Sequence, residues 1–260
     1  MSGMGGIGGA GMLLPILARF GWKGIVIGLI LMAVIYGGGL LKGGGSSTPQ
    51  QKAVNQPQDE QVQFIGYVFD DAQAFFSDEL ASRGTQYQEA KLVVFTGATE
   101  SGCGTGSASV GPFYCPLDRK VYIDVSFYQQ LSKRFGAPGD FAQAYVIAHE
   151  VGHHIQNLRG GLQQREDQKS AILVELQADC LAGVWAHSAE RRGLVEVGDV
   201  DEALRAAASV GDDAIQRRET GYVRPESWTH GSAEQRKNAF DRGYRGGDLD
   251  RCSPSSLASR

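Results

Sequence analysis

The longest uninterrupted apolar stretch of the chain lies near its amino terminus. Residues 24–41 (GIVIGLILMAVIYGGGLL) carry no charge and are flanked by Lys23 and Lys42. About 20 apolar residues span the hydrocarbon core of a bilayer, so this stretch is just long enough to form one transmembrane helix. A cleaved signal peptide is the alternative, although residues 46–48 (SST) make a poor cleavage site. A helix buried in protein is a weaker alternative, because the polar residues that follow could not cover it.

The segments on either side of the apolar stretch predict no fold of their own. Residues 1–23 are rich in glycine, and residues 42–61, rich in Gly, Ser, Pro and Gln, are typical of a flexible linker. Arg19 and Lys23 outweigh Lys42, which favours a cytoplasmic amino end. We therefore expect a single-pass membrane protein whose folded domain, residues 62–260, lies outside the cytoplasm.

Beyond the linker, the hydrophobic pattern changes to short strands followed by helices. Apolar residues at helical spacing predict helices, and short β-branched or aromatic runs predict strands. The predicted helices are residues 64–80, 141–158, 170–192 and 201–218, and the predicted strands are 91–95, 121–125 and, briefly, 113–114. A few strands followed mainly by helices favour an α+β domain.

Composition and charge limit the classes of function. The chain has 25 Lys and Arg against 29 Asp and Glu, a formal net charge of −4, which excludes the basic surface expected of a duplex nucleic-acid binder. Hydrophobic residues make up 42% of the chain, enough for one good core. We therefore expect no nucleic-acid partner, and the sequence does not indicate an oligomeric state.

The four cysteines indicate disulfides rather than a metal site. Cys103, Cys115, Cys180 and Cys252 contain no CxxC pair, which argues against a four-cysteine zinc site. An even number in a domain outside the cytoplasm favours two disulfides. Of the three possible pairings we favour Cys103–Cys115, which closes a glycine-rich loop, and Cys180–Cys252, which ties the tail to a helix. Four buried free thiols are the alternative.

The candidate chemistry lies in the first long helix after the strands, in the run His149-Glu150-Val151-Gly152-His153. Helical residues four apart differ by about 40° around the axis, so both imidazoles leave the same face. Two nitrogens placed in this way suit a tetrahedral zinc ion, with Glu150 beside its open position.

The next helix carries Glu175 and Asp179, again four apart and on one face. A hairpin through residues 159–161 would bring Glu175 over the two histidines as a third ligand. Asp179, one turn later, could accept the second N–H of a ligand imidazole and fix its tautomer. The alternative pattern HExxHxxGxxH is excluded, because Gln156 and Arg159 stand where it needs Gly and His.

Three other residues of these helices receive plainer interpretations. His154 points about 100° away from His153 and is expected to be a packing or surface histidine. His187 is interpreted as structural. Gly152 within a helix costs about 1 kcal/mol relative to Ala, which a strand or substrate backbone passing close to the helix would explain.

A further histidine stands near the carboxyl end. His230 lies at a predicted loop-to-helix junction, with Ser232 as a plausible N-cap. It could hydrogen-bond an oxyanion in the site, or it could be a loop histidine satisfied by backbone groups. Arg236 could be a partner of Asp179 or a surface charge.

These motifs resemble those of a bacterial family of neutral zinc metallopeptidases, the YpfJ-type proteins. The resemblance covers nearly the whole chain beyond the linker. The glycine-rich amino-terminal segment and the single anchor of this chain are also similar to those of the family. One departure is that the chain has no basic residue before Arg19, which bears on the orientation of the anchor. The matching segments are SGCG (101–104), GPFYCP (111–116), AYVIAHEVGHHIQ (144–156), ELQADCLAGVWA (175–186), GDDAIQ (211–216) and THGSAEQR (229–236).

The resemblance implies a zincin-like domain with His149, His153 and Glu175 as zinc ligands. It also implies Glu150 as general base for a zinc-activated water. The ExxxD spacing is similar to that of gluzincins, and the THG…R run is similar to the SHP…R element of membrane-associated gluzincins. That similarity favours functional roles for His230 and Arg236.

The sequence therefore predicts a zinc metalloendopeptidase anchored in a bacterial inner membrane, with its catalytic domain in the periplasm or the extracellular space. Its partners would be a protein or peptide substrate and, through residues 24–41, the lipid bilayer. One alternative is a non-proteolytic, zinc-bearing adaptor of envelope proteins, against which the intact Glu150 argues. Another is a zinc amidase acting on a non-protein substrate such as a peptidoglycan cross-link.

Overall fold

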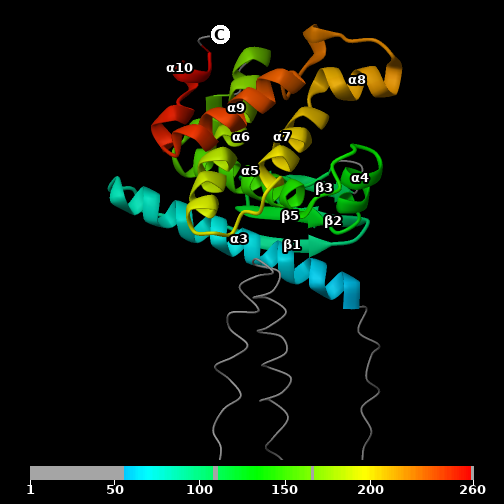
Figure 1. Ribbon diagram of the computed structural model, residues 1–260. Helices are drawn as coiled ribbons and strands as arrows, with labels where there is room; N and C mark the ends of the chain where they lie inside the picture. Colours follow the sequence, from blue (N-terminus) through cyan, green and yellow to red (C-terminus); the bar gives the residue numbers. More distant parts are fainter. Residues whose placement is uncertain (1–55, 108–110, 165–166, 259–260) are drawn as a thin grey trace, which may run out of the picture.

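The computed structural model describes residues 56–107, 111–164 and 167–258 (Figure 1). The predicted transmembrane stretch, residues 24–41, and the segment before it lie outside the described residues. Within the described ranges, no helix combines the length and the apolar character that crossing a bilayer requires. The first described helix begins at Gln56, inside the segment predicted as linker.

A small mixed sheet lies beside a group of helices, which gives the predicted α+β arrangement (Figure 1). Strand β1 (Lys91–Phe95) runs parallel to β5 (Lys120–Asp124), and β4 (Phe113–Cys115) pairs antiparallel with the other side of β5. The strand order is β1-β5-β4, so β4 is an edge strand. A separate hairpin joins β2 (Ala98–Ser101) to β3 (Gly104–Ser107). All three predicted strands are confirmed, whereas the hairpin was not predicted.

The helices account for most of the other residues that the structure describes. Three of the four predicted helices are confirmed as α3, α5 and α6; the ends of α5 and α6 shift by no more than two residues, whereas α3 begins eight residues before its predicted start. The helices are α3 (Gln56–Ser82), α4 (Phe127–Lys133), α5 (Asp140–Leu158), α6 (Gln168–Arg191), α7 (Asp199–Ser209), α8 (Asp212–Thr220), α9 (Ala233–Gly246) and α10 (Pro254–Leu257), with 3₁₀ turns η2 (Gly161–Gln164), η3 (Pro225–Ser227) and η4 (Leu249–Cys252).

The single helix predicted over residues 201–218 is wrong. The structure has two helices there, α7 and α8, separated at Val210 and Gly211. Gly211 has extended backbone angles, and a Cβ added to it would lie 2.3 Å from the amide nitrogen of Ala233. The start of α9 therefore passes so close to Gly211 that the chain has to turn there, which the local helical pattern does not indicate.

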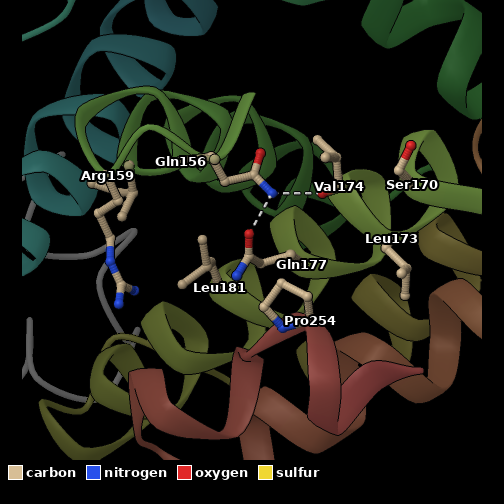
Figure 2. Close-up of a pocket in the computed structure, with 10 residues that line it drawn as sticks. Gln156, Arg159, Ser170, Leu173, Val174, Gln177, Leu181 and Pro254 are labelled. Carbon is tan, nitrogen blue, oxygen red and sulfur yellow. Dashed lines mark hydrogen bonds between the residues drawn. The ribbon is translucent and has the colours of Figure 1, made fainter. Parts of the chain in front are cut away.

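Helix α5 is the centre of the domain and is buried on nearly every side. A helix that is apolar around most of its circumference belongs in a core, and α3, α6, α7 and the sheet surround α5. The turn η2 connects it to α6, so that α5 and α6 form the predicted hairpin. Across this hairpin the side-chain amide of Gln156 donates to the Val174 carbonyl at 2.6 Å and to Gln177 Oε1 at 3.0 Å (Figure 2).

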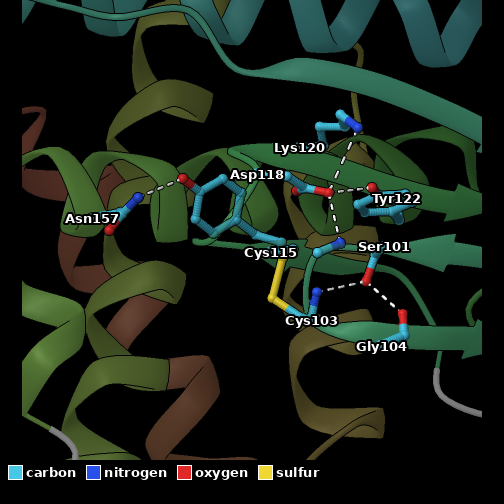
Figure 3. The surroundings of a disulfide bond; sticks show 10 residues. Ser101, Cys103, Gly104, Cys115, Asp118, Lys120, Tyr122 and Asn157 are labelled. Atoms are coloured by element: carbon cyan, nitrogen blue, oxygen red, sulfur yellow. Dashed lines mark hydrogen bonds and ion pairs between the residues drawn. A yellow bond between two sulfur atoms is a disulfide. The ribbon is translucent and has the colours of Figure 1, made fainter.

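Two disulfides fasten the edges of the domain, and their pairing confirms the prediction. Cys103–Cys115 joins the turn of the β2–β3 hairpin to the end of β4, with Cα atoms 5.8 Å apart (Figure 3). Beside it, the Asp118 carboxylate accepts hydrogen bonds from the amide of Gly102 and the hydroxyl of Tyr122. The second disulfide, Cys180–Cys252, ties η4 to α6.

Glycines set the distance between α6 and α9. A Cβ added to Gly183 would lie 2.1 Å from the carbonyl oxygen of Phe240, and one added to Gly243 would lie 1.9 Å from that of Cys180. Real Cβ atoms do not approach other heavy atoms so closely, so the two helices pack backbone against backbone. This contact places the second half of α9 beside the middle of α6.

We expect the Gly183→Ala substitution to destabilise the protein by about 1–3 kcal/mol, because the helices have to separate to accept the methyl group. The matched control is Gly66→Ala in α3, where an added Cβ would meet no atom within 4 Å. The control should raise the free energy of unfolding by up to about 1 kcal/mol, because Ala favours helix over Gly. Urea unfolding of both variants tests this, and equal stability of the two would contradict the proposed close contact.

Candidate metal centre

Three side chains from α5 and α6 bring their ligand atoms together. His149 Nε2 lies 3.4 Å from Glu175 Oε2, and His153 Nε2 lies 3.5 Å from the same oxygen. The ligand atoms of all three residues lie within 4.8 Å of one another, and all three residues are buried. Two imidazole nitrogens and one carboxylate are a donor set that zinc prefers in catalytic sites. The predicted hairpin geometry is therefore confirmed.

The close contact of α5 with α6 accounts for Gly152. A Cβ at this position would lie 3.1 Å from the carbonyl oxygen of Ala178 and 3.2 Å from its Cα. A close backbone neighbour was expected, but it is helix α6 rather than a strand or a substrate. Because the two helices touch at this point, Glu175, about one turn before Ala178, reaches the histidines.

Asp179 orients the first histidine. Its fully buried carboxylate accepts a hydrogen bond from His149 Nδ1 at 2.8 Å and another from the Tyr145 hydroxyl at 2.6 Å. Arg236, from α9, donates to both carboxylate oxygens, each at 2.8 Å. Since a carboxylate only accepts, Nδ1 of His149 carries a proton, and Nε2 is the ring nitrogen turned toward Glu175. The partners predicted for Asp179 are therefore in contact with it.

The charges in this network hold the acids ionised. Burial would raise the pKa of Asp179, but Arg236 and His149 outweigh burial and hold that pKa at about 2. Burial likewise would raise the pKa of Glu175, and the two histidines hold it well below its usual value. Burial would lower the pKa of His149, yet Asp179 and Glu175 raise it to about 9. A metal ion that binds here has to displace a proton from His149.

A cleft of about 520 Å³ opens beside the three donors. Glu150, which follows His149 on α5 and is only 6% exposed, lines it together with Tyr145 and Arg236. The opposite parts of the wall come from β4 and the segment before it, from α4, and from α8. Its apolar lining residues include Phe113, Phe127, Phe135, Val146, Val210 and Ile215.

His230 also borders this cleft and is exposed. Asp212, at the start of α8, accepts a hydrogen bond from the His230 backbone amide at 2.6 Å, and its second oxygen lies 3.2 Å from His230 Nδ1. Ser232 caps α9 by accepting from the Gln235 amide, as predicted. His230 is therefore a cleft residue whose ring and backbone are both held by one carboxylate.

The two histidines interpreted as structural lie away from the donors. His154 is fully buried, with Nδ1 2.9 Å from the Tyr114 hydroxyl and Nε2 2.6 Å from the Gln88 carbonyl oxygen. His187 Nδ1 lies 2.8 Å from the Tyr244 carbonyl oxygen on α9. Both rings are satisfied by structural partners, which confirms the interpretation.

Sequence reasoning missed three residues of the site. Tyr145 stands four residues before His149, so helical spacing could have placed it on the ligand face. Gln156, three residues after His153, has its Oε1 2.8 Å from His153 Nδ1 and could have been found in the same way. Asp212 gave no such signal, because it reaches His230 only through the folding of α8 against the chain before α9.

Comparisons with known proteins place the chain in a family. A family model described as "Putative neutral zinc metallopeptidase" matches residues 1–254. The uncharacterized protein YpfJ of Escherichia coli K12 is 41% identical over 267 residues, which cover 97% of this chain and 92% of that protein. An uncharacterized protein of Mycobacterium tuberculosis strain H37Rv is 46% identical over 188 residues, which cover 66% of this chain and 64% of that protein. No solved structure matches the chain significantly.

We expect Arg236→Met to destabilise the metal-free protein by about 3–5 kcal/mol, because it leaves the Asp179 carboxylate buried without its cation. The control is Arg245→Met on the same helix, which removes an exposed ion pair with Asp241 and should leave the free energy of unfolding nearly unchanged. Urea unfolding in the presence of a chelator measures both. Equal stabilities would mean that the buried ion pair does not hold α9 against α6.

Proposed function

The chain belongs to the family of neutral zinc metallopeptidases, and on that basis we propose that it is a zinc-dependent endopeptidase that hydrolyses peptide bonds in proteins or peptides. The observation that carries the proposal is the meeting of His149, His153 and Glu175 at the wall of one cleft, with Glu150 beside them. An adaptor that only holds zinc would need no carboxylate in that position, so Glu150 argues for chemistry.

The donor set fits zinc. His149 and His153 would bind it through Nε2 and Glu175 through its carboxylate, while Asp179 and Arg236 hold His149 in place. When bound, zinc acts as a Lewis acid that polarises the scissile carbonyl and lowers the pKa of water.

Glu150 is the general base in this proposal. Its carboxylate takes a proton from the attacking water and later gives it to the leaving amine. Because the Asp212 carboxylate only accepts, it takes the Nδ1–H of His230, so His230 donates through Nε2 in its doubly protonated form to the carbonyl oxygen of the substrate as negative charge develops there. The contacts of Asp212 with the ring and the backbone of His230 support this role, because they orient the imidazole at the border of the cleft.

The cleft favours an extended peptide over a compact non-protein amide. β4 is an edge strand, and Phe113 and Tyr114 of this strand line the cleft. An extended chain can pair with such an edge through main-chain hydrogen bonds. The apolar residues of α4 and α8, among them Phe127 and Ile215, would contact the side chains of the substrate.

The location of the protein is part of the proposal. Residues 24–41 would anchor it in the inner membrane of a bacterium, with the folded domain in the periplasm or outside the cell. The two disulfides support an oxidising compartment for that domain.

The central test compares full-length wild type, Glu150→Gln and His149→Ala. Zinc content is measured by elemental analysis, and cleavage of a denatured protein mixture by mass spectrometry of the products. We expect Glu150→Gln to keep its zinc and to lose at least about 10²-fold in rate, because only the proton transfer is removed. His149→Ala should lose both zinc and activity. A wild type that holds one zinc per chain and cleaves nothing would contradict the peptidase and favour the adaptor or the amidase.

A second test addresses His230. We expect His230→Gln to lower kcat by about 10²–10³ with zinc content unchanged, because it removes a hydrogen bond that strengthens as the reaction proceeds. The matched control is His187→Gln, which changes a histidine near the carboxyl end of α6 that contacts the Tyr244 carbonyl, and it should leave kcat as in the wild type. Equal rates for the two variants would exclude a catalytic role for His230.

A further inference from the structure

The two histidine donors are held by chemically different partners. His149 meets the charged carboxylate of Asp179, whereas His153 Nδ1 lies 2.8 Å from Oε1 of Gln156, a neutral amide. Gln156 stands three residues after His153 on α5 and is 2% exposed. Its contacts therefore form inside the protein, where each hydrogen-bonding group needs a partner.

Backbone carbonyls fix the direction of every hydrogen bond around Gln156. The Val174 carbonyl, 2.6 Å from Gln156 Nε2, can only accept, so the NH₂ group of Gln156 faces it. Gln177 is fixed in the same way, because its own NH₂ group donates to the Cys252 carbonyl at 2.8 Å. Gln177 Oε1 then accepts the second N–H of Gln156 at 3.0 Å.

This leaves one possibility for His153. Because both N–H groups of Gln156 are used, the atom that faces the imidazole is the amide oxygen, and His153 Nδ1 must be the donor. Nδ1 of His153 therefore carries a proton, which leaves Nε2, 3.5 Å from Glu175 Oε2, as the ring nitrogen available to a metal. Two carbonyls and two amides thus select the tautomer that can bind a metal.

We propose that Gln156 is a positioning residue for the metal centre, which sets the tautomer and the ring orientation of His153, with Gln177 and the Cys252 carbonyl supporting it from behind. The proposal rests on the metal site of the proposed function but not on its peptidase chemistry. It also connects the carboxyl-terminal segment to the site, since the Cys180–Cys252 disulfide holds the supporting carbonyl against α6.

A neutral amide suits this position better than a carboxylate. The Val174 carbonyl oxygen and Gln177 Oε1 both face the second half of the Gln156 side chain. A carboxylate there would place one oxygen against two acceptors, and only its other oxygen would meet a donor, His153 Nδ1–H. Gln156 and Gln177 also line a cavity of about 230 Å³ behind the hairpin, together with Arg159 and Pro254 (Figure 2).

The test measures the zinc affinity of the full-length protein by competition with a chromophoric chelator. In Gln156→Met, which keeps the shape and removes the hydrogen bonds, zinc should bind about 10–100-fold more weakly. The matched control is Asn157→Met, the next residue of α5, whose amide donates to the Tyr114 hydroxyl at 2.8 Å and not to a ligand. The affinity of the control should stay within about threefold of the wild type, because no ligand loses its partner.

Two further measurements separate positioning from loss of structure. Unfolding temperatures of the metal-free variants measure the structural cost by itself, and that of Gln156→Met, which loses three buried hydrogen bonds, should fall further than that of Asn157→Met, which loses one. In ¹⁵N-labelled, zinc-loaded protein, the Nδ1–H resonance of His153 should persist in the wild type and in Asn157→Met. It should be absent in Gln156→Met.

Wild-type zinc affinity in Gln156→Met, or an equal loss of affinity in both variants, would overturn the proposal. A wild type that binds no zinc would overturn it together with the proposed function. Zinc binding without any peptidase activity would contradict the proposed function alone, because the comparison of zinc affinities still decides the role of Gln156.

Discussion

The buried carboxylate of Asp179 is the interaction on which the site depends. Removing an ionised acid from water costs several kcal/mol unless charge and hydrogen bonds compensate. Here Arg236 supplies the charge, and Tyr145 and His149 supply further donors. The partners come from α5 and α9 and the acid from α6, so satisfying one charge fixes three helices relative to one another. The backbone contact between α6 and α9, which Gly183 permits, brings Arg236 within reach.

The same ion pair determines the charge that a metal would meet. Arg236 balances Asp179, so Asp179 can make His149 a better ligand without adding net charge to the site. Glu175 and Glu150 then remain as the cleft carboxylates beside the histidines, since Glu219, which also lines the cleft, is paired with Arg134. A divalent cation matches them in charge. His153 is held by the neutral amide of Gln156. A carboxylate in that place would add another buried negative charge close to Glu175 and Asp179.

The parts of the site that depend on local spacing could be predicted from the sequence, and the parts that depend on packing could not. His149 and His153 share a helix face whatever surrounds them, and Glu175 follows after a hairpin with an evident turn. Arg236, in contrast, is 57 residues from Asp179, and only the contact between α6 and α9 decides between a buried partner and a surface charge. The break at Gly211 was missed for the same reason, because it is imposed by a segment distant in sequence.

One turn of α6 shows why its residue types are arranged as they are. Glu175 and Asp179 lie one turn apart on the face toward α5, where one can reach a metal and the other orients its ligand. The side chains of Gln177 and Cys180 point in other directions. Both contact the carboxyl-terminal segment at Cys252, Gln177 by a hydrogen bond and Cys180 by a disulfide. These four side chains leave one helix at fixed angles around its axis. A change in the twist of α6 would therefore displace Glu175, Asp179 and the contacts with the carboxyl-terminal segment together. The carboxyl-terminal segment therefore supports the helix that carries Glu175 and Asp179, although it supplies no donor itself.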